Sequence, residues 1–229
     1  MMNMMHGKDT FSCAKRTLVS FALGFALPLA AANEVWVSDE RGNDATGAGT
    51  YDSPYKTIQK GVDEVDSGGT VKILRGIYGE GEEHFAAGHT NRVVISKSIT
   101  LDGVEGKEVT HLVGYLDPAT TYGNGPAAIR CIQIGDTAAK NTVIKNLTLR
   151  DSGADSVNEL KGYGGAVNYS GATTRSTVCL IDCVISNCAA VMGGGLHGMT
   201  AVRCQISACH STGFGTAARY SRLLHCLIL

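Results

Sequence analysis

A short pattern that recurs near the C-terminal end of this chain decides its fold. It reads LIDCVISNC at 180–188, AVRCQISAC at 201–209 and LLHCLIL at 223–229. The central cysteines, Cys183, Cys204 and Cys226, are separated by 21 and 22 residues. Three short strands and their turns need roughly 20–25 residues, so the spacing predicts one structural turn per repeat.

The pattern extends upstream along the chain. Ile144-Lys145-Asn146 is an earlier copy, with Asn146 in the place of the cysteine. We place the extra residues before Cys183 in insertions at 151–160 and 173–177. Cys188 and Cys209 each follow five residues after a central cysteine. Equivalent side chains should therefore form ladders about 4.8 Å apart, one containing Asn146, Cys183, Cys204 and Cys226, the other Cys188 and Cys209.

Short β-type runs separated by glycine and asparagine fill the chain from about residue 90. They span 92–95, 98–101, 128–134, 142–149, 165–169, 178–186, 196–207 and 223–229. Charged residues make up only 18% of the chain, and it has 29 glycines. We therefore expect an all-β fold, a right-handed parallel β-helix with three short strands per turn of about 22 residues. Because the apolar pattern still runs at 227–229, we also expect either further turns beyond a truncated end or a partner that supplies the next turn.

The cysteine count leaves two interpretations of the ladders open. The chain has eight cysteines, and seven remain after Cys13 is removed with a signal peptide. An odd number cannot form a closed disulfide framework, which favours stacks of free thiols. Disulfides between neighbouring turns remain the alternative, because the separation lies within bridging range.

Residues 33–79 form a different unit, which we interpret as a cap on the first turn. A strand at 34–38 and a polar loop precede a helix, for which Ser53 is the expected N-cap and Pro54 the first residue. Its apolar face comprises Ile58, Val62 and Val65. An uncovered first turn would expose strand edges and an apolar end, and this face can cover it. Residues 80–229 are then the β-helix turns.

The first 32 residues are typical of a signal peptide. Lys8, Lys15 and Arg16 precede an apolar stretch at 18–29, and Ala30-Ala31-Ala32 supplies the small residues of a cleavage site. The alternative is an uncleaved anchor, although the stretch is short for a membrane span. We expect an exported protein, extracellular or at the cell surface, with no transmembrane helix in its mature part.

Two segments resemble known groups of exported proteins. SPYKTIQKGV at 53–62, with GTV at 69–71 and GIY at 76–78, resembles the N-terminal module of pectate-lyase-like right-handed β-helix proteins of bacteria. ISNCA at 185–189, followed by GGGL at 193–196, resembles the short repeats of polymorphic outer-membrane proteins, with Ile185 where those repeats carry Phe. The first resemblance implies that the helix covers the open end of the β-helix. It also implies polysaccharide as a ligand. The catalytic members hold calcium through carboxylates and use an Arg or Lys side chain as the base.

Candidate catalytic residues are scarce. The charged column that contains Lys145, Asp182, Arg203 and His225 offers one carboxylate, whereas calcium prefers six to eight oxygen ligands. We therefore expect no metal site and no cofactor, and calcium enters only if the chain belongs to an enzyme.

Four residues are candidates for ligand binding. His197 and Arg219 follow glycine clusters on corresponding strands and could line a sugar-binding face. Asp182 and Arg203 lie in the charged column. The competing interpretation is that each of them is only structural or simply exposed to solvent, without binding a ligand.

Two functions are compatible with these features. The first is a non-catalytic scaffold or adhesin-like module that contacts polysaccharide. The second is the N-terminal part of a polysaccharide lyase or glycoside hydrolase. The formal net charge of −1 gives no electrostatic reason to expect nucleic acid as a partner.

Overall fold

The computed structural model describes residues 33–85, 89–135, 139–155, 162–171 and 177–229. These ranges hold the residues of the expected cap at 33–79 and most of the expected β-helix turns at 80–229. The expected signal peptide (1–32) and most of the two expected insertions (151–160 and 173–177) lie outside them.

The chain is all-β, and the strands in its described ranges form three sheets whose neighbouring strands are parallel, apart from one antiparallel pair, β4 and β5. Sheet A contains, in order, β1 (Glu34–Val37), β2 (Thr70–Ile73), β6 (Thr100–Gly103), β9 (Val143–Lys145), β12 (Cys179–Ile181), β15 (Thr200–Val202) and β19 (Arg222–Leu224). Sheet B contains β3 (Gly76–Tyr78), β7 (Thr110–Val113), β10 (Thr148–Gly153), β13 (Val184–Ala190), β16 (Gln205–Ser207) and β20 (Leu227–Ile228), with β17 (His210–Ser211) also paired to β13. Sheet C contains β4 (Glu83–Phe85), β5 (His89–Ile95), β8 (Arg130–Ile134), β11 (Val167–Tyr169), β14 (Leu196–His197) and β18 (Ala218–Arg219).

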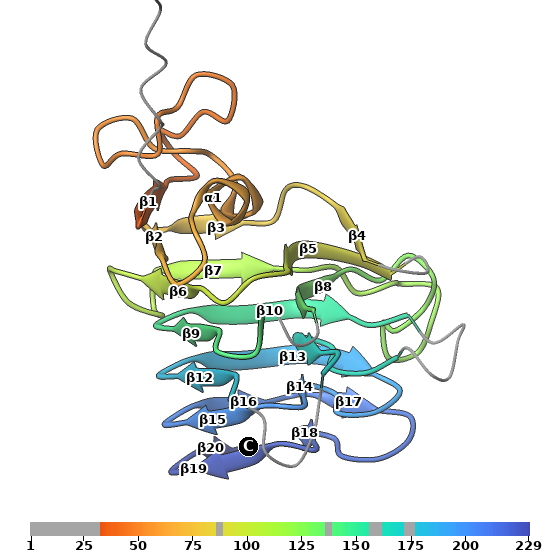
Figure 1. Ribbon diagram of the computed structural model, residues 1–229. Helices are drawn as coiled ribbons and strands as arrows, with labels where there is room; N and C mark the ends of the chain where they lie inside the picture. The colour runs from red at the N-terminus through yellow and green to blue at the C-terminus, as the bar shows by residue number, and fades with distance from the viewer. Residues whose placement is uncertain (1–32, 86–88, 136–138, 156–161, 172–176) are drawn as a thin grey trace, which may run out of the picture. The chain divides into compact units, whose positions relative to one another are not determined.

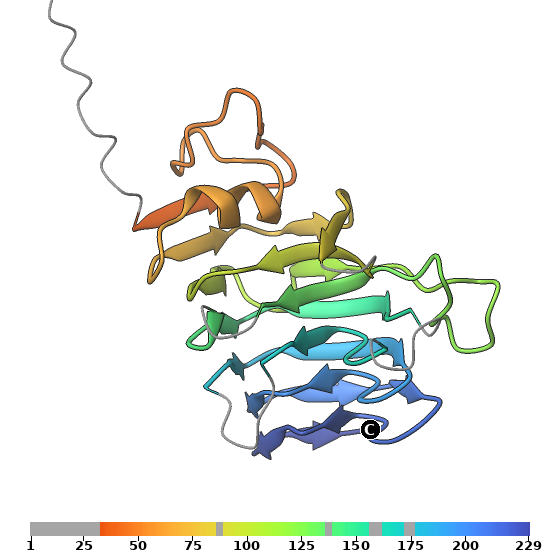
Figure 2. The ribbon, with the colours of Figure 1, turned by 45° about the vertical axis from the view of Figure 1, so that its right-hand side comes forward.

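From β2 onward the chain visits the three sheets in turn. It passes, for example, from β9 in sheet A to β10 in sheet B and β11 in sheet C, and then returns to sheet A at β12. Successive strands of one sheet therefore lie beside one another although they are far apart in sequence (Figures 1 and 2).

In-register apolar columns form the core between the sheets. In sheet A the column comprises Val35, Val71, Leu101, Ile144, Leu180, Ala201 and Leu223. In sheet B it comprises Tyr78, Leu112, Leu149, Ile185, Ile206 and Ile228. Most members are fully buried, and each such leucine or isoleucine contributes on the order of 1.5–3 kcal/mol to stability.

Several runs expected from sequence are split by sharp bends. The run at 142–149 contains β9 and the start of β10, and the run at 178–186 contains β12 and the start of β13. The bend residues are in the left-handed conformation, with φ of 59° at Asn146, 53° at Asp182, 51° at Arg203 and 52° at His225. A single left-handed residue turns the chain from sheet A to sheet B. The hydrophobic pattern continues on both sides of it, so the sequence does not reveal the bend.

The expected place of Asn146 in the cysteine ladder is wrong by one residue. Lys145 pairs with Ile181, so Asn146 aligns with Asp182 and Leu147 aligns with Cys183. The side chain of Asn146 instead donates a hydrogen bond to Asp102 Oδ1, at 2.9 Å. A one-residue slip reverses the face on which a strand side chain lies, which explains why Leu147 is in the core and Asn146 is not.

Helix α1 (Ile58–Glu64) begins later than expected, and its N-cap is Thr57 rather than Ser53. Thr57 Oγ1 accepts a hydrogen bond from the backbone N–H of Lys60. Asp44 accepts hydrogen bonds from the backbone N–H groups of Lys56 and Thr57, at 2.7 and 3.1 Å. Tyr55 forms a parallel bridge with Val37, which keeps the chain extended after Pro54.

The apolar face of this segment lies where sequence places it. Ile58, Val62 and Val65 are buried, and α1 contacts β1, β2 and β5 (Figure 1). A Cβ at Gly61 would lie 2.7 Å from Val37 Cγ2, so glycine permits this close approach of helix and sheet. No helix in the described ranges is long and apolar enough to cross a membrane.

Candidate functional site

The outer face of sheet C carries a continuous polar row. Gln133 on β8 pairs with Asn168 on β11, Asn168 pairs with His197 on β14, and His197 pairs with Arg219 on β18. The preceding residue on each strand is a member of the core column, namely Ile132, Val167, Leu196 or Ala218. Because side chains alternate along a strand, the four polar residues share the opposite face.

His197 and Arg219 are therefore neighbours on adjacent strands, and two tyrosines enclose them. The His197 ring stacks on Tyr163, with centroids 4.6 Å apart and planes inclined by 13°. Tyr220 meets the same ring edge-on at 5.7 Å. The Arg219 guanidinium lies 4.7 Å from the centroid of Tyr220 and 5.4 Å from that of Tyr163. The arrangement combines flat apolar rings with a cation and an imidazole.

The electrostatic environment keeps His197 neutral. Burial lowers its pKa to about 4, and the positive charges of Arg219 and Arg130 act in the same direction. At neutral pH the ring therefore offers one N–H donor and one lone pair rather than a charge.

Asp182 and Arg203, the other candidate pair, lie elsewhere. They are aligned on the bends between sheets A and B, and Arg203 Nη2 lies 2.5 Å from Asp182 Oδ2. Arg203 lowers the pKa of this carboxyl group. Both side chains are more than a third exposed, so solvent weakens the ion pair. The positive charge of Arg203 and the negative charge of Asp182 offset one another. The structure thus joins the four candidates as two separate pairs.

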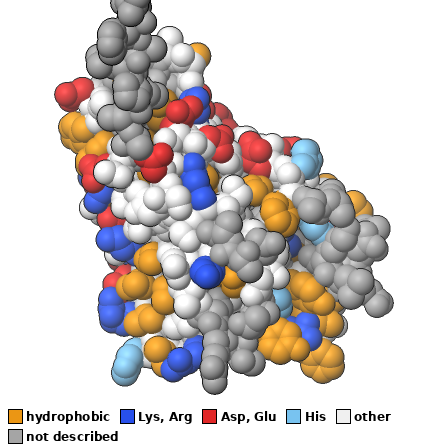
Figure 3. Space-filling model, in the orientation of Figure 1, with side chains coloured by type: hydrophobic (Ala, Val, Ile, Leu, Met, Phe, Trp, Pro, Cys, Tyr) orange, Lys and Arg blue, Asp and Glu red, His pale blue; other side chains and the backbone are white. Residues whose placement is uncertain are grey.

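Exposed aromatic side chains continue the site: Tyr122 and Phe214 lie on loops from sheet B to sheet C, and Tyr220 lies on the bend after β18. Tyr122 stacks on His210, with ring centroids 5.6 Å apart. Phe214 and Tyr220 are 73% and 58% exposed. The backbone N–H of Gly193 bonds to the carbonyl of Phe214, and Arg219 contacts Met192, so these loops are contiguous. Figure 3 shows hydrophobic side chains gathered over the end of this surface, with basic side chains among them. We name it the aromatic corner: Tyr122, Tyr163, His197, His210, Phe214, Arg219 and Tyr220.

A scan against protein-family models and a search of curated proteins find no match to this chain. The aromatic corner is therefore interpreted from its own geometry.

Five of the seven cysteines in the described ranges are buried, and Cys179 and Cys226 are partly exposed. Cys183 aligns with Cys204, and Cys188 with Cys209, on adjacent strands, and each of these thiols donates a hydrogen bond to a backbone carbonyl. The seven cysteines of the described ranges are free thiols. Burial raises the pKa of Cys131 to about 11, and the pKa of Cys188 is also raised by burial. These two thiols are poor nucleophiles, which points to a packing role, whereas the pKa of Cys204, beside Cys183, is lowered to about 7.

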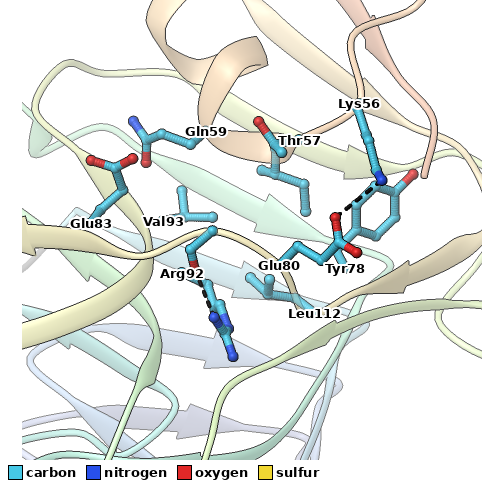
Figure 4. A pocket seen from close by; sticks show the side chains of 11 residues that line it. Lys56, Thr57, Gln59, Tyr78, Glu80, Glu83, Arg92, Val93 and Leu112 are labelled. Atoms are coloured by element: carbon cyan, nitrogen blue, oxygen red, sulfur yellow. Dashed lines mark hydrogen bonds and ion pairs between the residues drawn. The ribbon is translucent and has the colours of Figure 1, made fainter. Parts of the chain in front are cut away.

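A separate cavity of about 150 Å³ lies between α1 and strands β3, β5 and β7 (Figure 4). Lys56 pairs with Glu80 across its mouth at 3.1 Å. Gln59 binds both backbone groups of Val94, and Arg92 donates to the carbonyls of Gly81 and Val113. Most of its polar groups are engaged with the protein, so the cavity offers few groups to a ligand.

Metal ligands are not clustered in the part of the chain that the structure describes, where no group of three or more His, Cys, Asp or Glu side chains could hold a metal ion. Asp102, the most enclosed carboxylate of sheet A, is held by Asn146, Lys145 and Lys72.

Sequence reasoning missed Tyr163, Tyr220 and the polar row upstream of His197. A usable signal did exist, because Gln133, Asn168, His197 and Arg219 each follow an apolar strand residue. The spacings of 35, 29 and 22 residues conceal the row, since loops of unequal length separate the strands.

Proposed function

We propose that this chain is an exported module, cell-surface or extracellular, that binds polysaccharide at the aromatic corner. The observation that carries the proposal is the His197–Arg219 pair enclosed by Tyr163 and Tyr220. A pyranose ring has apolar C–H faces and a rim of hydroxyl groups. Aromatic rings pack on such faces, while the cation and the imidazole can bind hydroxyl or carboxylate groups.

We further propose that the three sheets form a right-handed parallel β-helix with three strands per turn. The in-register columns and the regular passage from sheet A to B to C support this architecture. A β-helix repeats its loops along one edge, which would give an extended ligand such as polysaccharide a series of contacts. The signal-peptide pattern at 1–32 supports export.

A binding role is favoured over catalysis by the weak basicity of His197. A side chain with a pKa of about 4 is a poor proton acceptor near neutral pH, where general bases work best with a pKa near the operating pH. The same neutral imidazole remains a good hydrogen-bonding group.

Affinity electrophoresis through gels that contain polygalacturonate, alginate, xylan or dextran tests the proposal. At least one polysaccharide should retard the chain, and Phe214→Ala together with Tyr220→Ala should abolish most of the retardation. Tyr51→Ala is the matched control, because Tyr51 is 53% exposed but meets Trp36 edge-to-face outside the corner. Equal retardation of all variants, or none on any gel, would contradict the proposal.

The second candidate is a polysaccharide lyase, which is favoured by one observation: an imidazole lone pair beside the cation of Arg219. In that case Arg219 would neutralise a uronate carboxylate and His197 would remove the neighbouring carbon-bound proton. An increase in unsaturated-product absorbance on polygalacturonate or alginate, lost in His197→Gln, would establish it. The same assay with calcium and with a chelator shows whether calcium takes part.

A further inference from the structure

The buried Arg130 sets the direction of the hydrogen bonds along the polar row. Arg130 is 1% exposed, and its Nη1 donates to Gln133 Oε1 at 2.9 Å and to Asn91 Oδ1 at 2.8 Å. A guanidinium group can only donate hydrogen bonds, so the atom of Gln133 that faces it must be the oxygen. The Gln133 amide nitrogen accordingly donates to Ser170 Oγ and to the carbonyl of Ile134.

This orientation passes to the next strand. Gln133 Oε1 also accepts a hydrogen bond from Asn168 Nδ2, at 3.0 Å. The Asn168 amide is thereby oriented with its nitrogen toward Gln133 and its oxygen toward His197.

The oxygen of Asn168 then selects the protonated nitrogen of His197. Asn168 Oδ1 lies 2.9 Å from His197 Nδ1. A carbonyl oxygen only accepts, so Nδ1 must carry the proton, and in the neutral ring Nε2 has the lone pair. Nε2 makes no hydrogen bond to a described residue. It is not one of the fully buried polar atoms without a partner, so it remains accessible to a ligand.

We propose that Arg130, Gln133 and Asn168 act as positioning residues that hold His197 as its Nδ1–H tautomer, so that Nε2 accepts a hydrogen bond from a sugar hydroxyl group. This inference rests on the proposed function and deepens it, because it assigns the chemical group that the corner recognises beside Arg219. Arg219 can donate hydrogen bonds to the ligand, and His197 Nε2 can accept one. The pair therefore matches a ligand that carries a hydrogen-bond acceptor next to a hydroxyl group.

The tautomer is measurable without any ligand. Long-range ¹H–¹⁵N correlation spectra of the ¹⁵N-labelled full chain at pH 7 should show His197 with a protonated Nδ1 and an unprotonated Nε2. Asn168→Leu removes the acceptor and should give a mixture of the two tautomers. A proton on Nε2, or a mixture of tautomers in the unsubstituted chain, would overturn the inference.

The role of Nε2 in recognition needs a second measurement. The double variant Asn168→Leu/His197→Phe replaces both hydrogen-bond partners with apolar groups, which limits the damage to folding, and keeps a ring on Tyr163. It should bind the retarding polysaccharide about fivefold more weakly, as expected for one lost hydrogen bond. His225→Phe, an exposed histidine outside the corner, should bind normally.

The two proposals fail in different ways. A fixed tautomer with undiminished binding by the double variant would remove Nε2 from recognition and leave the proposed function standing. No retardation by any polysaccharide would remove both.

Discussion

Tyr220 follows Arg219 as Gly198 follows His197 on the neighbouring strand, and both residues have positive φ, 49° and 85° respectively. Glycine adopts this conformation readily, whereas a bulky side chain there is strained by roughly 1–2 kcal/mol. The chain tolerates this strain at the residue whose ring contacts both His197 and Arg219.

Replacing Tyr220 with glycine should therefore separate stability from binding. We expect Tyr220→Gly to leave the free energy of unfolding unchanged or to raise it by up to about 1 kcal/mol, because relieved strain offsets the added chain entropy. Retardation by polysaccharide should be lost, while Tyr220→Phe keeps it. Urea denaturation and affinity electrophoresis measure the two effects. A destabilisation of Tyr220→Gly well above that of Tyr220→Phe would contradict the strain argument.

His197 should make the stability of the fold depend on pH. Burial lowers its pKa in the folded chain to about 4, below the ordinary value of 6.5, so the unfolded chain binds the proton more tightly. The resulting stability is complete above pH 6.5 and is lost as the pH falls toward 4, a change of about 3 kcal/mol. Urea denaturation from pH 7.5 to 4 measures it. His197→Phe should lose that part of the pH dependence, and identical profiles would refute the assignment.

Gly194 should be intolerant of any side chain. A Cβ at this position would lie 2.4 Å from the carbonyl oxygens of both His210 and Thr216, and neither backbone group can move without disturbing the neighbouring turn. We expect Gly194→Ala to lower the free energy of unfolding by about 3 kcal/mol or more. Gly79→Ala is the control, because its nearest contact is Val113 Cβ at an ordinary 3.7 Å, and it should change stability by less than about 0.5 kcal/mol.

The interior thiols should be protected in the folded protein. Cys131, Cys183 and Cys188 are fully buried with raised pKa values, whereas Cys179 and Cys226 are partly exposed. Brief iodoacetamide treatment at pH 8, followed by peptide mass mapping, should label Cys226 and Cys179 first and the other three only after unfolding. The intact mass should not change on reduction. A gain of two hydrogens or more would establish a disulfide between neighbouring turns.

The site was only partly predictable from sequence. The glycine clusters before His197 and Arg219 precede adjacent strands of sheet C, and no insertion separates them. Counting residues from each cluster was therefore enough to place the two side chains together. Tyr163 lies 34 residues before His197, and part of the loop between β10 and β11 intervenes. Loop length is not constrained by the strand pattern, so no count could bring that ring onto the imidazole.

The sequence by itself determined the 21- and 22-residue spacings from β12 to β15 and from β15 to β19, the all-β class and the apolar face of the segment around α1. These follow from local regularities, because the side chains that must be buried recur at fixed intervals. Only the tertiary structure decided the register of Asn146 with Asp182 and the start of α1 at Ile58, with Thr57 as its N-cap. It also decided the hydrogen-bonded order from Arg130 to His197. Each of these depends on which strand or loop lies beside a residue, and a left-handed bend or an insertion changes that neighbour without altering the hydrophobic pattern.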